Sequence, residues 1–466
     1  EESEGHQDEA AELRELAFAR GKLPNSASES WTLGAGAAFI DDGGNLGVSF
    51  GVYDTSYGIP TAPGAGHAHE AGGAEEGPVT IGLRQYRADL RGEVELGSGF
   101  LKKLSFRGGF ADYSHTEFEG SEIGTIFQSQ GIEFRSELAQ NNRGGWRGAT
   151  GLQYLSRDFE AIGAEAFVPP NRTRQIGLFT LQEFQLGGLH LEGALRYDGV
   201  SQEAQTLSIN RNFRNVSTAL GLSWLTENGI KFGANLSRTG RAPSAEELFS
   251  NGPHIATSAF EVGDPTLSSE RSWNGELYAR YDGDRLKASL TVFANRFDNF
   301  IFNTATGAEI DGLPVFQYFQ KDARFWGAEA DVSARIATFG HVDLIFDGVA
   351  DFTRAAISAG GGPVPRIPPL RLLGGIELQS AAFDFRGEVE RSAAQRRIAI
   401  FETPTSGFTL VNASMTWRPL GRNGGLAILA SAHNIFDVTA RRAASFTKDF
   451  VPLSGRDFRL SVRFSF

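Results

Sequence analysis

The chain of 466 residues contains no cysteine and only one methionine. Without cysteine there can be no disulfide framework and no thiolate-bound metal. No run of apolar residues approaches the roughly eighteen that a transmembrane helix requires, and the mean hydropathy is slightly negative, at −0.23. The sequence therefore offers no membrane-spanning helix.

Basic residues are fewer than acidic ones. The chain has 44 Lys and Arg and 56 Asp and Glu, which gives a net charge of −12. Binding to nucleic acid rests on basic patches, so this balance argues against a nucleic-acid partner. An acidic surface is compatible with attracting cations. We find no nucleophile elbow, P-loop or HExxH motif, and we expect no enzymatic activity.

The sequence does contain segments in which apolar and polar residues alternate with a period of two. The last segment, Asp457–Phe466, shows this alternation most clearly. Apolar residues occupy every second position from Phe458 to Phe466, while arginine and serine alternate with them. Side chains alternate between the two faces of a β-strand, so the segment has one apolar and one polar face. About ten residues of this pattern suffice for a tilted strand to cross a bilayer. The final strand of a soluble sandwich would show the same pattern, so the spacing of the turns has to decide.

Short turns and long loops alternate along the rest of the chain from Trp31 onward. The short turns are expected at 41–44, 97–99, 141–145, 187–188, 226–229, 282–284, 338–340, 379–381 and 421–425. The long loops are expected at 54–80, 112–131, 158–174, 201–215, 239–271, 299–323, 353–369, 392–407 and 434–455. Outer-membrane barrels show this alternation because short turns face the periplasm and long loops face outward. We therefore predict an all-β transmembrane antiparallel β-barrel in the bacterial outer membrane.

Nine short-turned hairpins and the final strand make about nineteen strands, an odd number. Bacterial single-chain barrels have an even count, because both chain ends lie on the periplasmic side. If the C-terminus is periplasmic, residues 1–30 form an extracellular loop segment and residues 31–466 form a partial barrel. Plugged transporters have 22 strands, so we expect about three strands and the plug to be absent. A miscount of one strand is the alternative.

The middle of the chain resembles the TonB-dependent receptors. The resemblance rests on R-A-P-S-A-E-E-L-F at 241–249, G-P-H-I-A-T at 252–257, F-E-V-G-D-P at 260–265 and N-I-F-D at 434–437. It implies a monomeric outer-membrane receptor that is surrounded by lipid and energised by the TonB complex through a plug. Neither a plug nor an energy-coupling box is recognisable here. Within this family, Y-G-I-P at 57–60 followed by G-H-A-H-E at 66–70 is similar to the ZnuD-type zinc-uptake group.

His67, His69 and Glu70 place two imidazoles and a carboxylate within four residues of a glycine-rich loop. Imidazole and carboxylate are suitable ligands for Zn²⁺. Ordering a flexible loop costs conformational entropy, so its affinity for a metal should be modest. We interpret the segment as a metal-capture loop, and the alternative is a solvated polar loop.

The expected loop at 112–131 carries a second group of candidate ligands, namely Asp112, His115, Glu117, Glu119 and Glu122. His115 and Glu117 are two residues apart, a spacing that points both side chains to one face of a strand. The resemblance to the zinc receptors implies an inner site in which Glu122 acts with His254, with His115 and Glu119 as neighbours. A tetrahedral zinc site needs about four ligands, so the plug would supply others. The alternative for His254 is a loop histidine bonded to the backbone after Pro253.

Three functions remain open from the sequence. The first is uptake of a divalent metal, with zinc as the transported ligand. The second is uptake of haem or siderophore iron, because some haem receptors carry a coordinating histidine between R-A-P and N-P-x-L elements, and His254 lies between R-A-P at 241–243 and D-P-T-L at 264–267. The His67 and His69 pair favours zinc, since haem needs an axial ligand but not a carboxylate-rich loop. The third is a passive pore.

Overall fold

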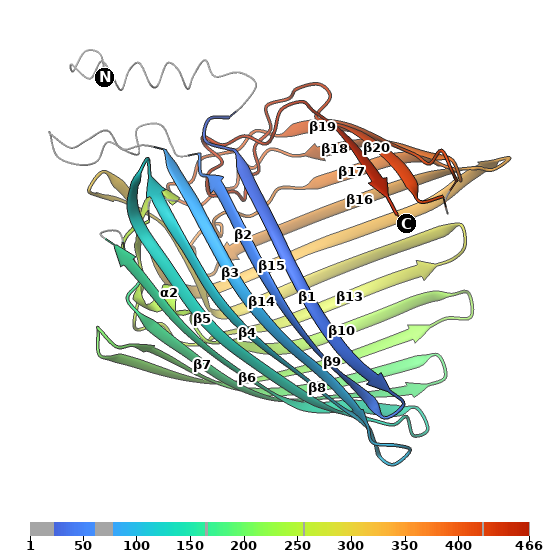
Figure 1. The fold of residues 1–466 in the computed structure, drawn as a ribbon, viewed down its shortest axis with the longest axis horizontal. Coiled ribbons are helices and arrows are strands. Elements are labelled where there is room, and N and C mark those ends of the chain that lie inside the picture. The colour runs from blue at the N-terminus through green and yellow to red at the C-terminus, as the bar shows by residue number, and fades with distance from the viewer. Residues whose placement is uncertain (1–22, 61–77, 164–165, 255–256, 422–423, 466) are drawn as a thin grey trace.

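The computed structural model describes residues 23–60, 78–163, 166–254, 257–421 and 424–465. In these residues the chain forms 21 strands and one short helix (Figure 1). The strands of the first half are β1 (Ser28–Asp41), β2 (Gly44–Gly58), β3 (Val79–Glu95), β4 (Leu101–Glu119), β5 (Glu122–Gln140), β6 (Trp146–Gly163), β7 (Asn171–Leu186), β8 (Leu189–Ala204), β9 (Ile209–Leu225) and β10 (Ile230–Arg241). Then come α2 (Ala245–Phe249), β11 (Asn251–His254), β12 (Ala259–Val262), β13 (Glu270–Asp282), β14 (Leu286–Ile310), β15 (Leu313–Phe339), β16 (Val342–Ile357), β17 (Arg371–Gln379), β18 (Phe383–Ser392), β19 (Phe408–Trp417), β20 (Leu426–His433) and β21 (Asp457–Phe464).

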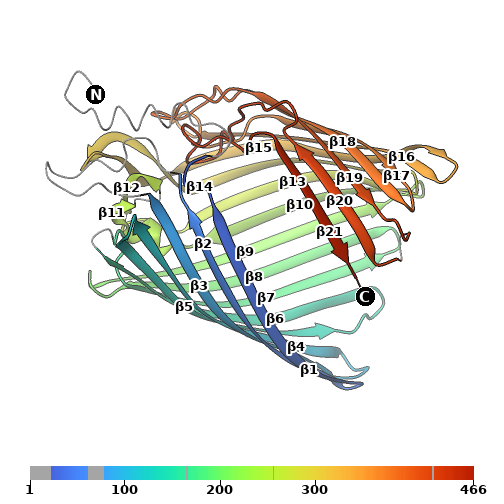
Figure 2. The ribbon, with the colours of Figure 1, turned by 45° about the horizontal axis from the view of Figure 1, so that its top comes forward.

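Nineteen of the 21 described strands form the curved sheet of the barrel, which is here called the wall. The other two, β11 and β12, are four-residue strands in the connection between β10 and β13. Each wall strand pairs antiparallel with its neighbour along the chain, and β10 pairs directly with β13. The strand number agrees with the sequence prediction. Strands β1 and β21 are the two edges of the sheet, and no pairing joins them among the described residues (Figure 2).

The short turns lie where the sequence predicted them. Gly187 and Gly188 connect β7 to β8, and residues 226–229 connect β9 to β10. Gly187, Gly229 and Gly340 have positive φ angles of 60°, 78° and 63°, which glycine adopts without a steric cost. These turns cluster at one end of the sheet, and the long connections cluster at the other, which is here called the long-loop end (Figure 1).

Three of the predicted long loops are wrong. Residues 201–215 belong to β8 and β9, which are joined by a short turn at residues 205–208. Residues 112–131 form the upper halves of β4 and β5, which meet at a turn at residues 120–121. Residues 299–323 likewise belong to β14 and β15, which turn at residues 311–312. In the upper part of β4 both faces carry polar side chains, so the apolar alternation that identifies a membrane strand is missing there. In β14, Phe300 and Phe302 pack against a buried cluster that includes Ala323 and Ile357. The β4–β5 and β14–β15 hairpins therefore continue as strands beyond the segments in which the sequence shows alternating apolar residues.

The outer face of the wall is apolar and exposed. Examples are Leu277 at 60%, Leu220 at 66% and Phe464 at 67% of full exposure. A continuous exposed apolar surface of this kind requires an apolar surrounding, and in outer-membrane barrels lipid provides it. Within the described residues, no helix combines the length and the apolar character needed to cross a bilayer.

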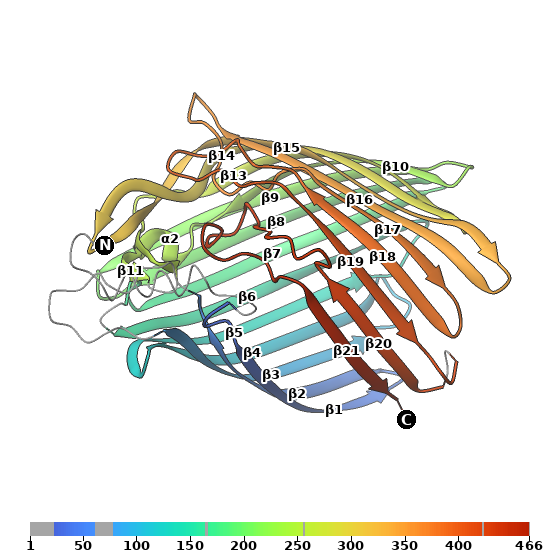
Figure 3. The same cartoon turned by 90° about the horizontal axis from the view of Figure 1, so that it is seen from above.

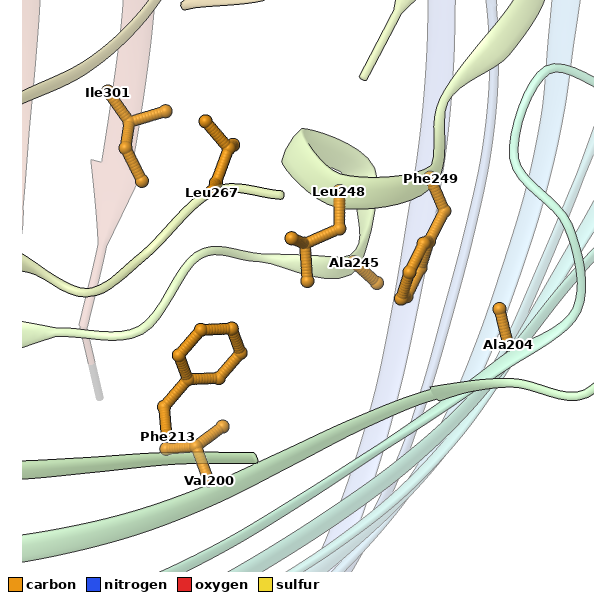
Figure 4. Packing of buried hydrophobic residues seen from close by; sticks show 8 residues of the cluster. All are labelled: Val200, Ala204, Phe213, Ala245, Leu248, Phe249, Leu267 and Ile301. Atoms are coloured by element: carbon orange, nitrogen blue, oxygen red, sulfur yellow. The ribbon is translucent and has the colours of Figure 1, made fainter. Parts of the chain in front are cut away.

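The connection between β10 and β13 packs against the inner face of the wall at the long-loop end (Figure 3). Leu248 and Phe249 of α2, which are almost fully buried, pack with Phe213 of β9 and Ile301 of β14 (Figure 4). Strand β12 also pairs in parallel with the upper part of β15. Burying a large apolar side chain contributes about 1.5–3 kcal/mol, so this cluster fixes the connection against the wall.

Candidate metal-binding site

His254 is the last residue of β11, and its imidazole is held by the neighbouring strand. His254 Nδ1 lies 2.9 Å from Oε1 of Glu261 on β12. An ionised carboxylate can only accept, so Nδ1–H donates this hydrogen bond, and in the neutral imidazole Nε2 then carries the lone pair. A carboxylate that holds the second ring nitrogen is the usual arrangement behind a metal-ligating histidine. The geometry thus presents Nε2 of His254 as a free ligand atom.

Glu117 on β4 faces this imidazole and also faces His115 on the same strand. Oε1 of Glu117 lies 4.0 Å from Nε2 of His254 and 3.8 Å from Nε2 of His115. The Glu117 side chain is only 6% exposed. On the far side of its ring, His115 Nδ1 lies 2.8 Å from the hydroxyl of Tyr113. Glu117 therefore lies between two imidazoles, each of which has a polar partner behind it.

Phenylalanine side chains pack on both histidines. Phe167 stacks on His254 with ring centroids 4.3 Å apart, and Phe127 stacks on His115 at 4.4 Å. The two phenylalanines touch each other edge to face at 6.1 Å. They belong to a buried cluster between β5, β6 and the connection that follows β6. Since these rings are buried, they restrict both imidazoles and shield Glu117 from water.

The backbone of β11 approaches Phe167 closely. The amide of Asn251 donates to the Phe167 carbonyl at 2.7 Å. A Cβ atom on Gly252 would lie 2.9 Å from the Cα atom of Phe167. Only glycine fits at this position without displacing one of the two segments, so Gly252 keeps His254 at its distance from Glu117.

Helix α2 anchors the same connection through charged contacts. Ser244 and Glu247 form a capping box, in which each side chain accepts from the backbone amide of the other residue. Arg157 on β6 lies 2.6 Å from Glu246. Burial would raise the pKa of the Glu246 carboxyl, but the charge and hydrogen bond of Arg157 outweigh burial and lower this pKa below its ordinary value. Both acids have the structural roles expected of residues in the receptor signature.

The other candidates from the sequence lie apart from this group. Glu119 ends β4 and Glu122 begins β5, so they pair across the tip of the hairpin, and no hydrogen bond or ion pair connects Glu122 with His254 in the described structure. Residues His67, His69 and Glu70 lie outside the described residues. The sequence analysis counted Glu117 among the candidate ligands at 112–122 but did not assign it to the inner site, and it did not name Glu261 as a ligand. The two-residue spacing of His115 and Glu117, which places both side chains on one face of β4, is the sequence signal for this part of the site.

The group is open rather than closed around an ion. In the described residues, no three His, Asp or Glu side chains converge closely enough to hold a metal. Tetrahedral zinc with bonds of about 2.0–2.1 Å brings neighbouring ligand atoms to about 3.4 Å from one another. The distances of 3.8 and 4.0 Å from Glu117 to the two Nε2 atoms are therefore slightly too wide. A small inward movement would bring Oε1 of Glu117 to zinc spacing from each imidazole.

Residues 15–435 match the family model described as TonB dependent receptor-like, beta-barrel. The chain belongs to this family, and like its members it is a protein of the bacterial outer membrane.

Comparison with individual proteins extends this result. The chain is 25% identical over 328 residues to a Heme/hemopexin utilization protein C of Haemophilus influenzae, which covers 62% of this chain and 43% of that protein. It thus spans less than half the length of this relative. Among solved structures, the copper transporter OprC has a TM-score of 0.80 at 18% identity, covering 96% of this chain and 73% of OprC. The FrpB iron transporter of Neisseria meningitidis (F3-3 variant) has a TM-score of 0.71 at 14% identity, covering 94% and 71%. At these identities the two structures share the fold.

Proposed function

We propose that this chain is the barrel of a TonB-dependent receptor that imports a divalent metal, most favourably zinc, across the outer membrane. In this proposal the loop with His67, His69 and Glu70 captures the ion outside, and His254 with Glu117 and His115 receives it at the barrel mouth. TonB would supply the energy through a plug domain, and the receptor would act as a monomer.

The proposal rests on one observation: the carboxylate of Glu117 lies near the imidazoles of both His115 and His254. Neutral imidazole and carboxylate are the donor set for zinc, and a buried carboxylate is costly unless a cation or hydrogen-bond donors compensate its charge. No hydrogen bond to the Glu117 side chain is found among the described residues, and its Oε1 lies 3.8 Å and 4.0 Å from the Nε2 atoms of His115 and His254. A divalent cation between these three groups would supply the missing compensation.

A second candidate function is uptake of haem or chelated iron. Two observations favour it, namely the similarity to the haem-utilization protein and the stacking of Phe167 beside the free Nε2 of His254. A histidine whose Nδ1 is held by a carboxylate could serve equally as an axial haem ligand. The buried Glu117 opposes this reading, because a carboxylate at 4.0 Å would compete for space and add negative charge beside a large apolar macrocycle.

Uptake of radioactive zinc by cells that carry the full-length receptor tests the proposal. We expect uptake at limiting zinc to require TonB and to fall at least tenfold in a His254→Ala variant. His433→Ala is the matched control, because His433 lies at the end of β20 and its imidazole hydrogen-bonds only to Ser431 among the described residues. If haem competes for uptake, or if zinc enters equally with and without TonB, the zinc function is wrong.

A further inference from the structure

A buried hydroxyl group without a hydrogen-bond partner lies next to Glu117. Thr125 on β5 is 0% exposed, and its Oγ1 atom forms no hydrogen bond among the described residues. Burying a hydroxyl group without a hydrogen bond is costly, and such groups are uncommon in folded proteins. An unpaired hydroxyl beside a candidate site therefore indicates a second state of the site in which it is bonded.

The register of the sheet determines which acceptor this hydroxyl can reach. Thr125 lies directly opposite Glu117 in the β4–β5 pair and directly opposite Gly163 in the β5–β6 pair. Residues that lie directly opposite in antiparallel strands share a face of the sheet, with Cβ atoms about 4.5–5.5 Å apart. Since Gly163 has no side chain, Glu117 is the cross-strand neighbour that offers a side-chain acceptor.

A β-bulge keeps Thr125 in this position. Glu117 pairs with Thr125, but the next residue of β4 pairs with Ile123, so Gly124 is an extra residue on β5. Bulges turn the side chains beside them and are frequent next to functional sites. A Cβ atom on Gly163 would lie 2.2 Å from the carbonyl oxygen of Gly124. The bulge thus packs closely against the end of β6, and this packing leaves Thr125 facing Glu117.

The two oxygens of the Glu117 carboxylate differ in their surroundings. Oε1 is the atom that lies 3.8 Å and 4.0 Å from the Nε2 atoms of His115 and His254. A metal ion held between the imidazoles and this carboxylate would therefore bind Oε1. Oε2 then remains for a hydrogen-bond donor, and a threonine hydroxyl can turn its hydrogen toward such an acceptor.

We propose that Thr125 is a positioning residue of the metal site, and that its hydroxyl donates a hydrogen bond to Oε2 of Glu117 when an ion binds Oε1. Carboxylates that ligate a metal are themselves hydrogen-bonded by outer partners, which fix their orientation. With Oε2 occupied, Glu117 binds through one oxygen, which suits four-coordinate zinc. Without this bond both oxygens are free to bind one ion, a mode that calcium accepts. Thr125 thus favours zinc over calcium, an inference that rests on the proposed function.

The test is a calorimetric titration of zinc into the purified full-length receptor and its Thr125→Val and Thr125→Ser variants. Valine keeps the shape of threonine but lacks the hydroxyl, so zinc affinity should fall about 10–100-fold. Serine retains the hydroxyl and should restore most of the affinity. Calcium should compete with zinc more effectively in Thr125→Val than in the wild type. Because the hydroxyl has no partner in the metal-free protein, Thr125→Val should not lower the thermal stability measured without metal.

Thr405→Val is the matched control. Thr405 is also a buried threonine whose hydroxyl has no partner among the described residues, but it lies in the connection between β18 and β19. Its substitution should leave zinc affinity unchanged. An equal loss of affinity in Thr405→Val and Thr125→Val would overturn the inference, because the loss would then not depend on a position beside Glu117.

A double-mutant cycle separates failure of this inference from failure of the proposed function. Glu117→Ala should weaken zinc binding, and adding Thr125→Val to it should have no further effect, because the acceptor is already absent. If Glu117→Ala and His254→Ala both bind zinc as the wild type does, the zinc function is wrong and this inference fails with it. If both lose affinity while Thr125→Val does not, or if Thr125→Val costs as much without Glu117 as with it, only the role of Thr125 is overturned.

Discussion

Glu261 Oε1 lies 2.9 Å from His254 Nδ1, so a carboxylate on β12 fixes the ring of a histidine on β11. The two strands are only four residues each, and their backbone pairing depends on a connection that packs against the wall. The orientation of one imidazole is thus determined by the folding of the whole β10–β13 connection.

Replacing Glu261 should weaken metal binding without removing a ligand. Loss of a carboxylate behind a ligating histidine typically costs 10–100-fold in metal affinity. We therefore expect Glu261→Ala to reduce the zinc affinity of the full-length protein by at least tenfold in calorimetry. Glu160→Gln, on the outer face of β6, serves as the control and should bind as the wild type does. Unchanged affinity in Glu261→Ala would show that His254 needs no such partner.

Gly252→Ala tests whether the approach of β11 to Phe167 sets the site. The added Cβ would lie 2.9 Å from a backbone atom, which cannot rotate away. Overpacking of this kind costs about 1–3 kcal/mol, and we expect His254 to be displaced while the barrel stays folded. Zinc affinity should fall about tenfold, with an unchanged β-sheet circular dichroism spectrum. Wild-type affinity would mean that the segment tolerates displacement.

Acid should loosen α2 through Glu246. Because the pKa of Glu246 is lowered in the folded protein, its ion pair with Arg157 stabilises the fold above the ordinary carboxyl pKa. This stabilisation is lost as the pH falls through the lowered value. Protection of the 245–250 amides, measured as the exchange rate relative to the intrinsic rate at each pH, should fall below about pH 4.5 in the wild type. In Glu246→Gln, this protection should already be low at pH 7 and should change little with acid. A parallel pH profile in both proteins would exclude this ion pair as the cause.

Removing His67 and His69 should affect capture and leave the inner group intact. These residues lie outside the described structure, so the expectation rests on their chemistry alone. We expect His67→Ala with His69→Ala to slow zinc uptake severalfold at limiting zinc and to have no effect at saturating zinc. A wild-type rate at limiting zinc would exclude a capture role for the loop.

The wall could be predicted from the sequence because lipid imposes a pattern on it. Leu460 and Val462 must be apolar and their neighbours need not be, so each strand carries its own signal. Turn residues such as Gly187 added the boundaries. Above the membrane this constraint ends, and the upper part of β4 reads as a polar loop although it continues as a strand.

The candidate site could be predicted only in part, because it depends on contacts between segments that are far apart in the sequence. His254 stood out because a recognisable signature surrounds it, and His115 because of its position in an acidic segment. Glu117 stood out in the same segment, but its role and that of Glu261 could not be assigned, since these roles depend on which strands meet at the mouth. The connection between β10 and β13 brings β11 and β4 together through tertiary packing, and no local periodicity encodes that contact.

The most direct test of the account is X-ray absorption at the zinc edge of the zinc-loaded full-length receptor. We predict a first shell at about 2.0–2.1 Å with imidazole nitrogens and a carboxylate oxygen. The imidazole signal should decrease in His254→Gln, and the carboxylate oxygen should be lost or replaced by water in Glu117→Gln. A shell of water oxygens alone, or a spectrum that both variants leave unchanged, would contradict a metal site at His254.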